Sequence, residues 1–273
     1  MDNIKPFIKW VGGKTQLLDE LKTRLPETYN KYYEPFIGGG ALLFSVQPKN
    51  AIINDYNKEV SNLYNIVKNK PDELISDLQK HENTESYFYA IRSLDRNKEE
   101  FNKLSDVERA SRFIYLNKTC YNGLYRVNRN DEFNVPFGKY KNPLICDSEN
   151  ITNVSKYLKD VEILNLDFEE ALKDASVGDF VYLDPPYDVV SKTASFTEYN
   201  KDGFTKEDQI RVKKVCDDLT SKNVKWMLSN ANTEFIKNLY SEYNIEIVDV
   251  KRYINSNSDK RTGIKEVIIR NYA

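Results

Sequence analysis

The fold is decided by one stretch, NKYYEPFIGGGALLFSVQPKNAIIND, at residues 30–55. Its aromatic start predicts a strand at 30–36, the glycines that follow predict a loop, and ALLF at 41–44 begins a helix. A second predicted strand, at 51–55, ends in Asp55. Two strands joined through a helix are the unit of an α/β fold, and nucleotide-binding units place a carboxylate at this point to bind ribose hydroxyls.

The rest of the chain extends this unit into a sheet that is interrupted by an insert. Further strands are predicted at 161–164, 180–183, 224–228, 245–250 and 267–270, with helices at 206–221 and 233–241. Between the two halves the apolar spacing is helical from about residue 58 to 121, and a hairpin pattern follows near 121–138. We therefore predict a Rossmann-like α/β core of residues 1–57 and 146–273, with an inserted domain at 58–145 made of helices and the β-hairpin.

Chemistry is expected at the end of the predicted strand at 180–183. The sequence there continues as Asp184-Pro185-Pro186-Tyr187, and α/β sheets bind ligands at the carboxyl ends of their strands. Two prolines remove two N–H donors, which leaves carbonyl and carboxylate acceptors beside an aromatic ring. Asp184 and the Pro185 carbonyl could accept both hydrogens of an exocyclic amine while Tyr187 stacks on the base, which must leave a duplex to be held in this way. The alternative for the motif alone is a Pro-Pro turn with a capping Asp.

Charge is distributed unevenly along the chain. Over the whole sequence, 40 Lys and Arg nearly balance 42 Asp and Glu. Residues 109–145, however, hold seven basic and two acidic residues, and residues 251–265 hold five basic and one acidic residue. Two basic patches on an acidic body are typical of a protein that binds phosphates at a defined place. Either patch alone is as often a solvated face.

The composition disfavours several classes of function. Charged residues make up 30% of the chain and no apolar run approaches a membrane span. The first residues lack the apolar segment of a signal peptide, so we expect a cytoplasmic protein that does not bind membranes. The cysteines lie far apart and His81 is the sole histidine, which argues against a metal site, a disulfide framework and Ser-His-Asp chemistry. We expect His81 at the surface, and we expect the cysteines to be buried: Cys120, Cys146 and Cys216.

The glycine-containing stretches indicate which nucleotide-like ligand the core binds. A Walker A phosphate loop needs a glycine five residues before Gly13, where the chain has Ile8. A dinucleotide fingerprint needs a third glycine where the chain has Leu43. What remains is the glycine loop with Asp55, which lets a ligand approach the backbone and offers an acceptor to two ribose hydroxyls. S-adenosylmethionine fits these features without needing a pyrophosphate loop.

With the glycine loop first, the basic hairpin next and Asp-Pro-Pro-Tyr last, the sequence resembles the Dam-type DNA adenine methyltransferases of the α order over nearly all of its length. The matching motifs are PFIKWVGGK at 6–14, EPFIGGG at 34–40, ND at 54–55, YNGLYR at 121–126 and EFNVPFG at 132–138. The resemblance implies an S-adenosylmethionine-dependent methyltransferase core, an insert that recognises double-stranded DNA, and methylation of adenine within GATC.

The resemblance also implies site residues. The catalytic residues would be Asp184, Pro185, Pro186 and Tyr187, and the cofactor would contact Trp10, Lys14, Phe36, Gly38, Gly40, Asp55 and Asp184. Contacts with DNA would come from Lys9, Tyr121, Asn122, Leu124, Arg126, Pro136, Arg252 and Arg261. Among these, Lys9 and Arg126 would touch guanines. A thymine methyl would contact Leu124 and Pro136, and Tyr121 or Asn122 would fill space near the flipped base.

Asp167 and Phe168 are further candidates for the cofactor site. The acid could accept from the cofactor's adenine amine while the ring stacks on the adenine. The alternative is that Asp167 caps the helix that begins near Phe168.

Two other functions remain open on the sequence. Methyltransferases of protein glutamine or of RNA bases use similar cofactor loops, but they tend to carry Asn where this chain has Asp184. A DNA-binding module with a vestigial cofactor site would not need Phe36, Gly38, Asp55 and Asp184 to be intact. We expect a monomer in solution, without a metal. The motifs do not distinguish an enzyme of a restriction system from a solitary or phage enzyme.

Overall fold

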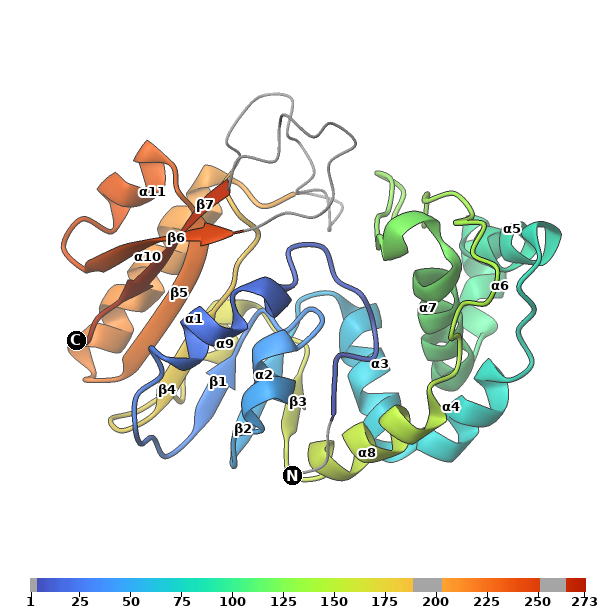
Figure 1. The fold of residues 1–273 in the computed structure, drawn as a ribbon, viewed down its shortest axis with the longest axis horizontal. Coiled ribbons are helices and arrows are strands. Elements are labelled where there is room, and N and C mark those ends of the chain that lie inside the picture. The colour runs from blue at the N-terminus through green and yellow to red at the C-terminus, as the bar shows by residue number, and fades with distance from the viewer. Residues whose placement is uncertain (1–3, 189–202, 251–263) are drawn as a thin grey trace.

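The chain folds around one central β-sheet. The computed structural model describes residues 4–188, 203–250 and 264–273. Seven strands pair in the order β3-β2-β1-β4-β5-β7-β6 (Figure 1). The pairs from β3 to β5 are parallel, and β7 is antiparallel to both β5 and β6. The strands are β1 (Tyr32–Glu34), β2 (Ala51–Asn54), β3 (Glu162–Leu164), β4 (Phe180–Leu183), β5 (Lys225–Ala231), β6 (Asn244–Val250) and β7 (Ile264–Arg270).

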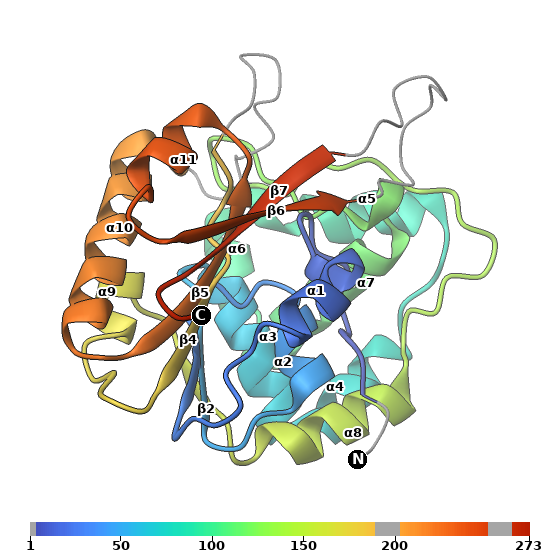
Figure 2. The ribbon, with the colours of Figure 1, turned by 60° about the vertical axis from the view of Figure 1, so that its left-hand side comes forward.

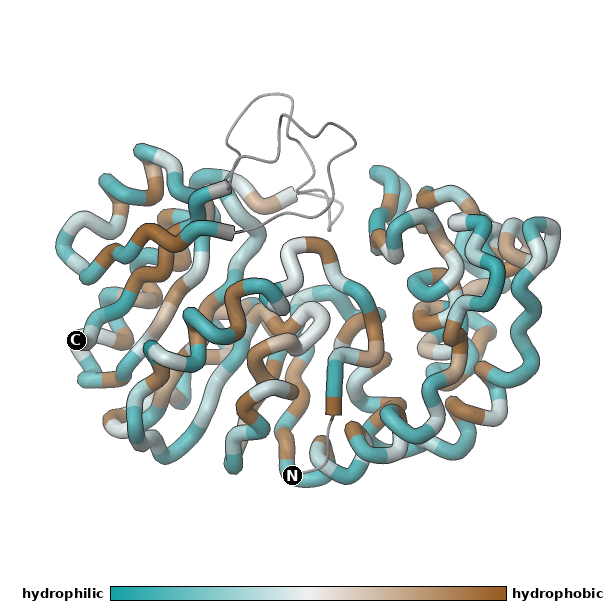
Figure 3. Tube along the Cα trace, viewed as in Figure 1, coloured by the Kyte–Doolittle hydropathy of each residue, from teal (hydrophilic) through white to brown (hydrophobic). Residues whose placement is uncertain are grey.

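The two faces of the sheet bury two separate apolar clusters. Alternate residues of a strand point to opposite faces, and this alternation places Tyr182 in one cluster and Leu183 in the other. The first cluster includes residues of α1 (Leu18–Lys22) and α2 (Ala41–Val46), and the second includes residues of α9 (Phe168–Ala171), α10 (Lys206–Ser221) and α11 (Glu234–Leu239). Figure 2 shows α9, α10 and α11 together on one side of the sheet, and Figure 3 shows hydrophobic residues along the central strands. The predicted α/β fold is confirmed.

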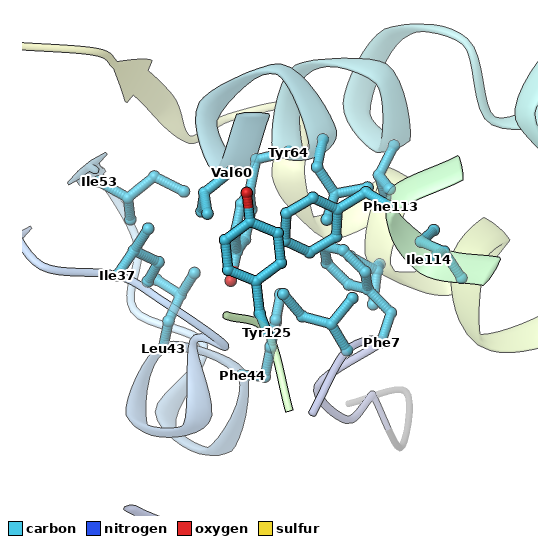
Figure 4. Close-up of a cluster of buried hydrophobic side chains, with 14 of the residues drawn as sticks. Phe7, Ile37, Leu43, Phe44, Ile53, Val60, Tyr64, Phe113, Ile114 and Tyr125 are labelled. Atoms are coloured by element: carbon cyan, nitrogen blue, oxygen red, sulfur yellow. The ribbon is translucent and has the colours of Figure 1, made fainter. Parts of the chain in front are cut away.

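Helices of the insert stand beside the sheet (Figure 1). Helix α7 is central there: it begins at a capping box between Ser105 and Glu108 and packs against α3, α4 and α5. Helix α3 also packs on β3 and α8, so it joins the insert to the core. Figure 4 shows the shared cluster, in which Tyr64 of α3 and Phe113 of α7 lie near Phe7. The helices of the insert are α3 (Lys58–Asn69), α4 (Pro71–Leu78), α5 (Glu85–Ser93), α6 (Lys98–Lys103) and α7 (Asp106–Thr119), and α8 (Ser148–Leu158) follows the insert.

The hairpin segment, residues 121–138, has two antiparallel arms that do not form regular strands. One bridge joins Val127 to Phe133. The Asn134 N–H donates to the Arg126 carbonyl at 3.1 Å. The predicted turn chemistry is present, but so short a ladder cannot hold the arms by itself.

Side chains from the helices hold the second arm of the hairpin segment. Asp95, buried after α5, accepts the Phe133 N–H at 2.8 Å, and Arg96 donates to the Phe133 carbonyl at 2.6 Å. Asp95 is itself paired with Arg96 and, at 2.7 Å, with Arg112. The buried acid therefore has two cationic partners and a backbone donor that compensate for its loss of water.

His81 is half-buried, so its predicted place at the surface is wrong. Its ring stacks on Tyr115 with centroids 4.3 Å apart. Its two nitrogens bond the Tyr87 hydroxyl at 2.9 Å and the Ser111 hydroxyl at 3.0 Å, which lets the ring leave water. Burial lowers the pKa of His81. The cysteines follow the prediction more closely: Cys120 and Cys216 are buried and Cys146 is half-buried.

Candidate active site

A large cavity lies at the carboxyl ends of β1, β2 and β4. Its volume is about 1160 Å³, which exceeds the space that one small ligand usually fills. Every residue predicted to catalyse or to bind the cofactor lines it, and so does one residue predicted to contact DNA. They are Lys9, Trp10, Lys14, Phe36, Gly38, Gly40, Asp55, Asp167, Phe168, Asp184, Pro185, Pro186 and Tyr187.

Asp55 is held at the end of β2 by two backbone donors. The Gly38 N–H donates to Oδ2 at 3.0 Å, and the Asn57 N–H donates to Oδ1 at 2.9 Å. Burial raises the pKa of Asp55 to about 6, although these two hydrogen bonds oppose the rise. A carboxylate has about four acceptor positions. Each oxygen can therefore accept one more hydrogen bond from a ligand in the cavity.

Gly38 is required because the Trp10 ring lies against it. The residue has a φ of +45°, and an added Cβ would lie 2.6 Å from that ring. Any side chain would therefore clash as well as strain the backbone. Trp10 also stacks on Tyr125 of the hairpin segment, with ring centroids 5.6 Å apart. Trp10 thus joins the glycine loop to the insert.

Aromatic rings form one wall of the cavity. The centroids of Phe36 and Phe168 lie 5.3 Å apart, and Phe204 meets Phe36 edge-on at 6.1 Å. The Arg211 guanidinium, from α10, lies 4.7 Å from the centroid of the Phe168 ring. Phe204 and Arg211 line the cavity too, and sequence reasoning missed both. They lie outside every motif, and a single Phe or Arg has no pattern that would mark it.

Asp167 caps α9, as the structural alternative predicted. Its Oδ1 accepts the Glu169 N–H at 3.0 Å. Arg211 donates to the same oxygen at 2.9 Å. Because both contacts are made to Oδ1, capping leaves Oδ2 as a further acceptor. The contact between Asp167 and the cofactor's adenine stays a prediction.

Asp184 follows β4 and is paired with Lys14. The Lys14 ammonium lies 2.8 Å from Oδ1 of Asp184, donates to the Gly12 carbonyl at 2.5 Å, and lies 4.5 Å from the centroid of the Tyr187 ring. Burial raises the pKa of Asp184 to about 6; Lys14 opposes this rise and Glu266 adds to it. The cavity therefore presents a carboxylate, a cation and an aromatic face together.

Two buried side chains from other elements hold the loop after Asp184. The Tyr187 hydroxyl donates to Oε2 of Glu266, from β7, at 2.7 Å. Nε2 of Gln209, from α10, donates to the Pro186 carbonyl at 2.7 Å. Sequence reasoning missed both residues, because a single Glu in a strand or Gln in a helix has no spacing that marks it.

Glu34 is a further buried acid in the cavity lining, at the end of β1. Its Oε2 accepts the Tyr32 hydroxyl at 2.6 Å. Burial raises the pKa of Glu34 to about 8 in spite of this hydrogen bond. Glu34 is therefore mostly protonated at neutral pH. The sequence motif contained this residue but gave it no role.

Lys9 is exposed, and its backbone is fixed by Asn117 of α7. The buried Asn117 side chain accepts the Lys9 N–H at 2.8 Å and donates to the Lys9 carbonyl at 2.8 Å. It also donates to the Gly123 carbonyl at 3.0 Å. The Lys9 side chain packs so closely on Gly123 that a Cβ at this glycine would overlap it. Lys9 and the hairpin segment therefore lie side by side.

The hairpin segment has a buried and an exposed face, as alternation along an extended chain requires. Its inward residues include Tyr125, Val127 and Val135. Of the predicted DNA contacts, Leu124, Arg126 and Pro136 alternate with these inward residues, and Leu124 is half-buried whereas Arg126 and Pro136 are exposed. Tyr121 and Asn122 are exposed in the 3-10 turn Tyr121–Gly123 that precedes the first arm. Arg126 is oriented by its Nε, which donates to Oδ1 of Asn134 at 2.7 Å. These residues lie outside the cavity lining.

Two predicted DNA contacts, Arg252 and Arg261, lie outside the described residues. Within residues 4–188, 203–250 and 264–273, no group of three or more His, Cys, Asp or Glu side chains is placed to hold a metal ion. None of the helices described is both long and apolar enough to cross a bilayer.

The chain is similar to known proteins over nearly its whole length. Residues 10–254 match the family described as D12 class N6 adenine-specific DNA methyltransferase. The chain is 46% identical to the Type II methyltransferase M1.LlaDCHI of Lactococcus lactis subsp. cremoris, over 99% of this chain and 96% of that protein. It is 46% identical to the Type II methyltransferase M.MjaIII of Methanocaldococcus jannaschii, over 98% and 99%. It is 33% identical to the DNA adenine methylase of Escherichia coli K12, over 98% and 95%.

Proposed function

We propose that this chain, which belongs to the D12 class N6 adenine-specific DNA methyltransferases, transfers the methyl group of S-adenosylmethionine to adenine within GATC in double-stranded DNA. The observation that carries the proposal is the cavity in which the glycine loop, Asp55 and the Asp184-Pro185-Pro186-Tyr187 loop meet. We infer that residues 1–57 and 146–273 bind the cofactor and catalyse, and that the insert at 58–145 reads the target. The names of the two Type II relatives support a role in a restriction-modification system.

The cavity has the groups that S-adenosylmethionine needs. Asp55 keeps an acceptor position on each oxygen for the ribose hydroxyls. The rings of Phe36 and Phe168 offer an apolar wall to the adenine, and Asp167 lies beside them for its amine. Trp10, Lys14, Gly38 and Gly40 line the same space. When bound, the cofactor supplies a methyl group on a positively charged sulfur.

The residues of the loop after β4 would orient the target amine. The ion pair with Lys14 uses Oδ1 of Asp184, so we assign Oδ2 and the Pro185 carbonyl as acceptors for the two amine hydrogens. Tyr187 would stack on the flipped base. Held in this way, the amine nitrogen would turn its lone pair toward the methyl group that the cofactor supplies, and holding two reactants in line lowers the entropic part of a barrier. Transfer would form a C–N bond and break the C–S bond, and Asp184 could accept the proton that the nitrogen has to lose.

The exposed face of the hairpin segment, together with Lys9, would read the four bases. An arginine can donate to two acceptors on a guanine edge, and apolar side chains can contact a thymine methyl in the major groove. Arg126 and Lys9 therefore suit the guanines, and Leu124 and Pro136 suit thymine. Tyr121 belongs to the same short turn as Gly123, on which Lys9 packs, and its side chain is 55% exposed. It would fill the space that the adenine leaves when it flips out of the duplex.

A methyl-transfer assay tests the chemistry. Wild-type protein with tritiated S-adenosylmethionine and a plasmid should place label on adenines in GATC. Asp184→Ala should abolish transfer and leave DNA affinity within a few-fold, because it removes an acceptor at the reacting nitrogen rather than a phosphate contact. Label on other bases, or rapid turnover by Asp184→Ala, would contradict the proposal.

A pair of arginine variants tests the reading of GATC. Arg126→Ala should relax discrimination at one guanine by about 1–3 kcal/mol. Arg129→Ala is the matched control, since Arg129 is an exposed arginine in the turn of the same segment. It should weaken every duplex alike, because phosphate contacts do not depend on sequence. The comparison uses GATC duplexes and single-base variants over a salt series. Equal losses on every duplex for Arg126→Ala would show that the bases are read elsewhere.

A further inference from the structure

The loop after Asp184 cannot anchor itself through its prolines. Pro185 and Pro186 have no N–H to donate, so hydrogen bonds that fix this part of the loop must come from outside it. Two buried amides provide them: Gln209 is 1% exposed and Asn230 is 0% exposed. Neither residue belongs to the predicted site.

The two amides form a continuous relay across the loop. Nε2 of Gln209 donates to the Pro186 carbonyl at 2.7 Å, and Oε1 of Gln209 accepts from Nδ2 of Asn230 at 3.0 Å. Oδ1 of Asn230 accepts the Asp188 N–H at 3.1 Å and the Ala231 N–H at 2.8 Å. The relay therefore begins and ends on the loop that carries Tyr187.

The direction of the relay is fixed by its ends. The Pro186 carbonyl can accept but not donate, and the Asp188 N–H can donate but not accept. Rotating either amide would place two oxygens or two NH₂ groups against each other. Gln209 therefore has one orientation that satisfies all of its neighbours, and the loop has one position that completes the relay.

We propose that Gln209 and Asn230 are positioning residues for methyl transfer. The relay holds the peptide group before Tyr187 and the one after it, while Glu266 holds the hydroxyl at the far end of the ring. It thereby sets the plane of the Tyr187 ring and, through the two rigid prolines, the direction of the Pro185 carbonyl. This inference rests on the proposed role of the loop in holding the target adenine.

Gln209→Ala separates positioning from general stability. In the full-length protein, with saturating cofactor and a GATC duplex, we expect the single-turnover rate constant to fall about 10- to 100-fold, since a small misplacement of reacting groups costs rates of this order. The dissociation constants of cofactor and DNA should stay at their wild-type values. Val212→Ala is the matched control, because Val212 lies one turn further along α10 and is equally buried. It should lower the melting temperature but keep the rate constant.

Gln209→Glu gives a second, independent readout. An ionised carboxylate cannot donate to the Pro186 carbonyl, whereas the protonated acid can donate there and still accept from Asn230. Its rate relative to Gln209→Ala should therefore rise as the pH falls. Taking this ratio at each pH cancels the titration of Asp184 and Asp208, which is common to both variants.

The following results would overturn the positioning role of Gln209 and Asn230. A folded Gln209→Ala with the wild-type rate constant, or a Gln209→Glu whose rate relative to Gln209→Ala does not change with pH, would overturn it. If Gln209→Ala does not fold, the rate of Gln209→Glu relative to the wild-type rate at each pH carries the same decision. Asp184→Ala is measured in parallel. An active Asp184→Ala refutes the proposed function itself, whereas an inactive Asp184→Ala beside a Gln209→Ala with the wild-type rate constant refutes the relay alone.

Discussion

The ion pair between Lys14 and Asp184 should set the lowest pH at which the enzyme works. In our proposal Asp184 accepts a hydrogen from the adenine amine, which requires the ionised form, since a protonated carboxyl has one oxygen that donates instead. Burial raises the pKa of Asp184 to about 6, and Lys14 limits the rise. Wild-type turnover should fall as the pH drops through about 6. Lys14→Met removes the opposing charge and should move this fall to a higher pH.

The geometry gives the size of the effect. At a separation of 2.8 Å, Coulomb's law with an effective dielectric constant of about 20 gives an attraction of about 6 kcal/mol. That attraction would correspond to a pKa difference of about 4, which is an upper bound because water can enter when the lysine is removed. The pKa of a carboxyl group beside an opposite charge is usually lower by about 1–3 than the pKa of one without that charge. We expect the acidic limb of the pH profile, the range in which turnover falls as the pH drops, to lie higher by this amount in Lys14→Met.

The assay is the pH dependence of kcat with cofactor and DNA both saturating, so that weaker cofactor binding does not enter the profile. Lys14→Arg is the control, since it keeps the charge and its acidic limb should stay near that of wild type. At pH 7 Lys14→Met should be slow, and it should gain about tenfold per pH unit until Asp184 is ionised. Glu34 also lies near Asp184 and would titrate in this range, since burial raises its pKa to about 8. If Lys14→Met and wild-type protein lose activity at the same pH, the assignment of Asp184 as the titrating acceptor is wrong.

Three further predictions use other buried acids. Asp55→Ala should weaken cofactor binding by up to about 1.5–3 kcal/mol for each hydrogen bond lost to the ribose hydroxyls. An unchanged dissociation constant of the cofactor, measured by calorimetry, would contradict the role of Asp55. Glu34→Gln should raise the melting temperature at pH 8 and above, and not at pH 4. The reason is that the pKa of about 8 in the folded protein lies above the ordinary glutamate value of 4.5, so stability falls between these values as the unfolded chain ionises. A Glu34→Gln variant that melts with the wild-type protein at both pH values would refute it. Asp95→Ala should cost about 3–5 kcal/mol in urea unfolding, because it leaves the buried Arg112 without its carboxylate partner, and a loss under 1 kcal/mol would count against that network.

The parts of the site that could be predicted from the sequence are those fixed by local chemistry. The glycine at position 38, the acid that ends β2 and the Pro-Pro turn after β4 are each determined by a few neighbouring residues, and each lies where it was expected. Family membership was predictable for the same reason, since the motifs and their order survive in the sequence alone. The specificity for GATC stays a prediction, because it depends on contacts with DNA.

The contacts that hold the site were not predictable, because they depend on the order of the strands. Glu266 and Asn230 reach the loop after Asp184 because β5 and β7 follow β4 in the sheet. Strand β5 was also predicted to end at residue 228, whereas it continues to Ala231. Ser229 and Asn230 break the apolar pattern there, yet both are buried, since the Tyr182 hydroxyl and Gln209 satisfy them. In the sequence, a polar residue after an apolar run is interpreted as the start of a loop, unless the partner that satisfies it in the core is known.

Helix α10 contacts both the loop after Asp184 and the wall formed by Asp167 and Phe168. Gln209 reaches the Pro186 carbonyl, while Arg211 reaches Asp167 and the Phe168 ring, where we place the cofactor's adenine. Residues two apart on a helix do not face each other, so the two side chains leave α10 in different directions. Removing the Gln209 amide therefore leaves the Arg211 contacts intact, and rate should separate from cofactor affinity in that variant. A change that moves the helix itself is different: loss of the capping box between Thr205 and Asp208 would displace both side chains and should lower both quantities together.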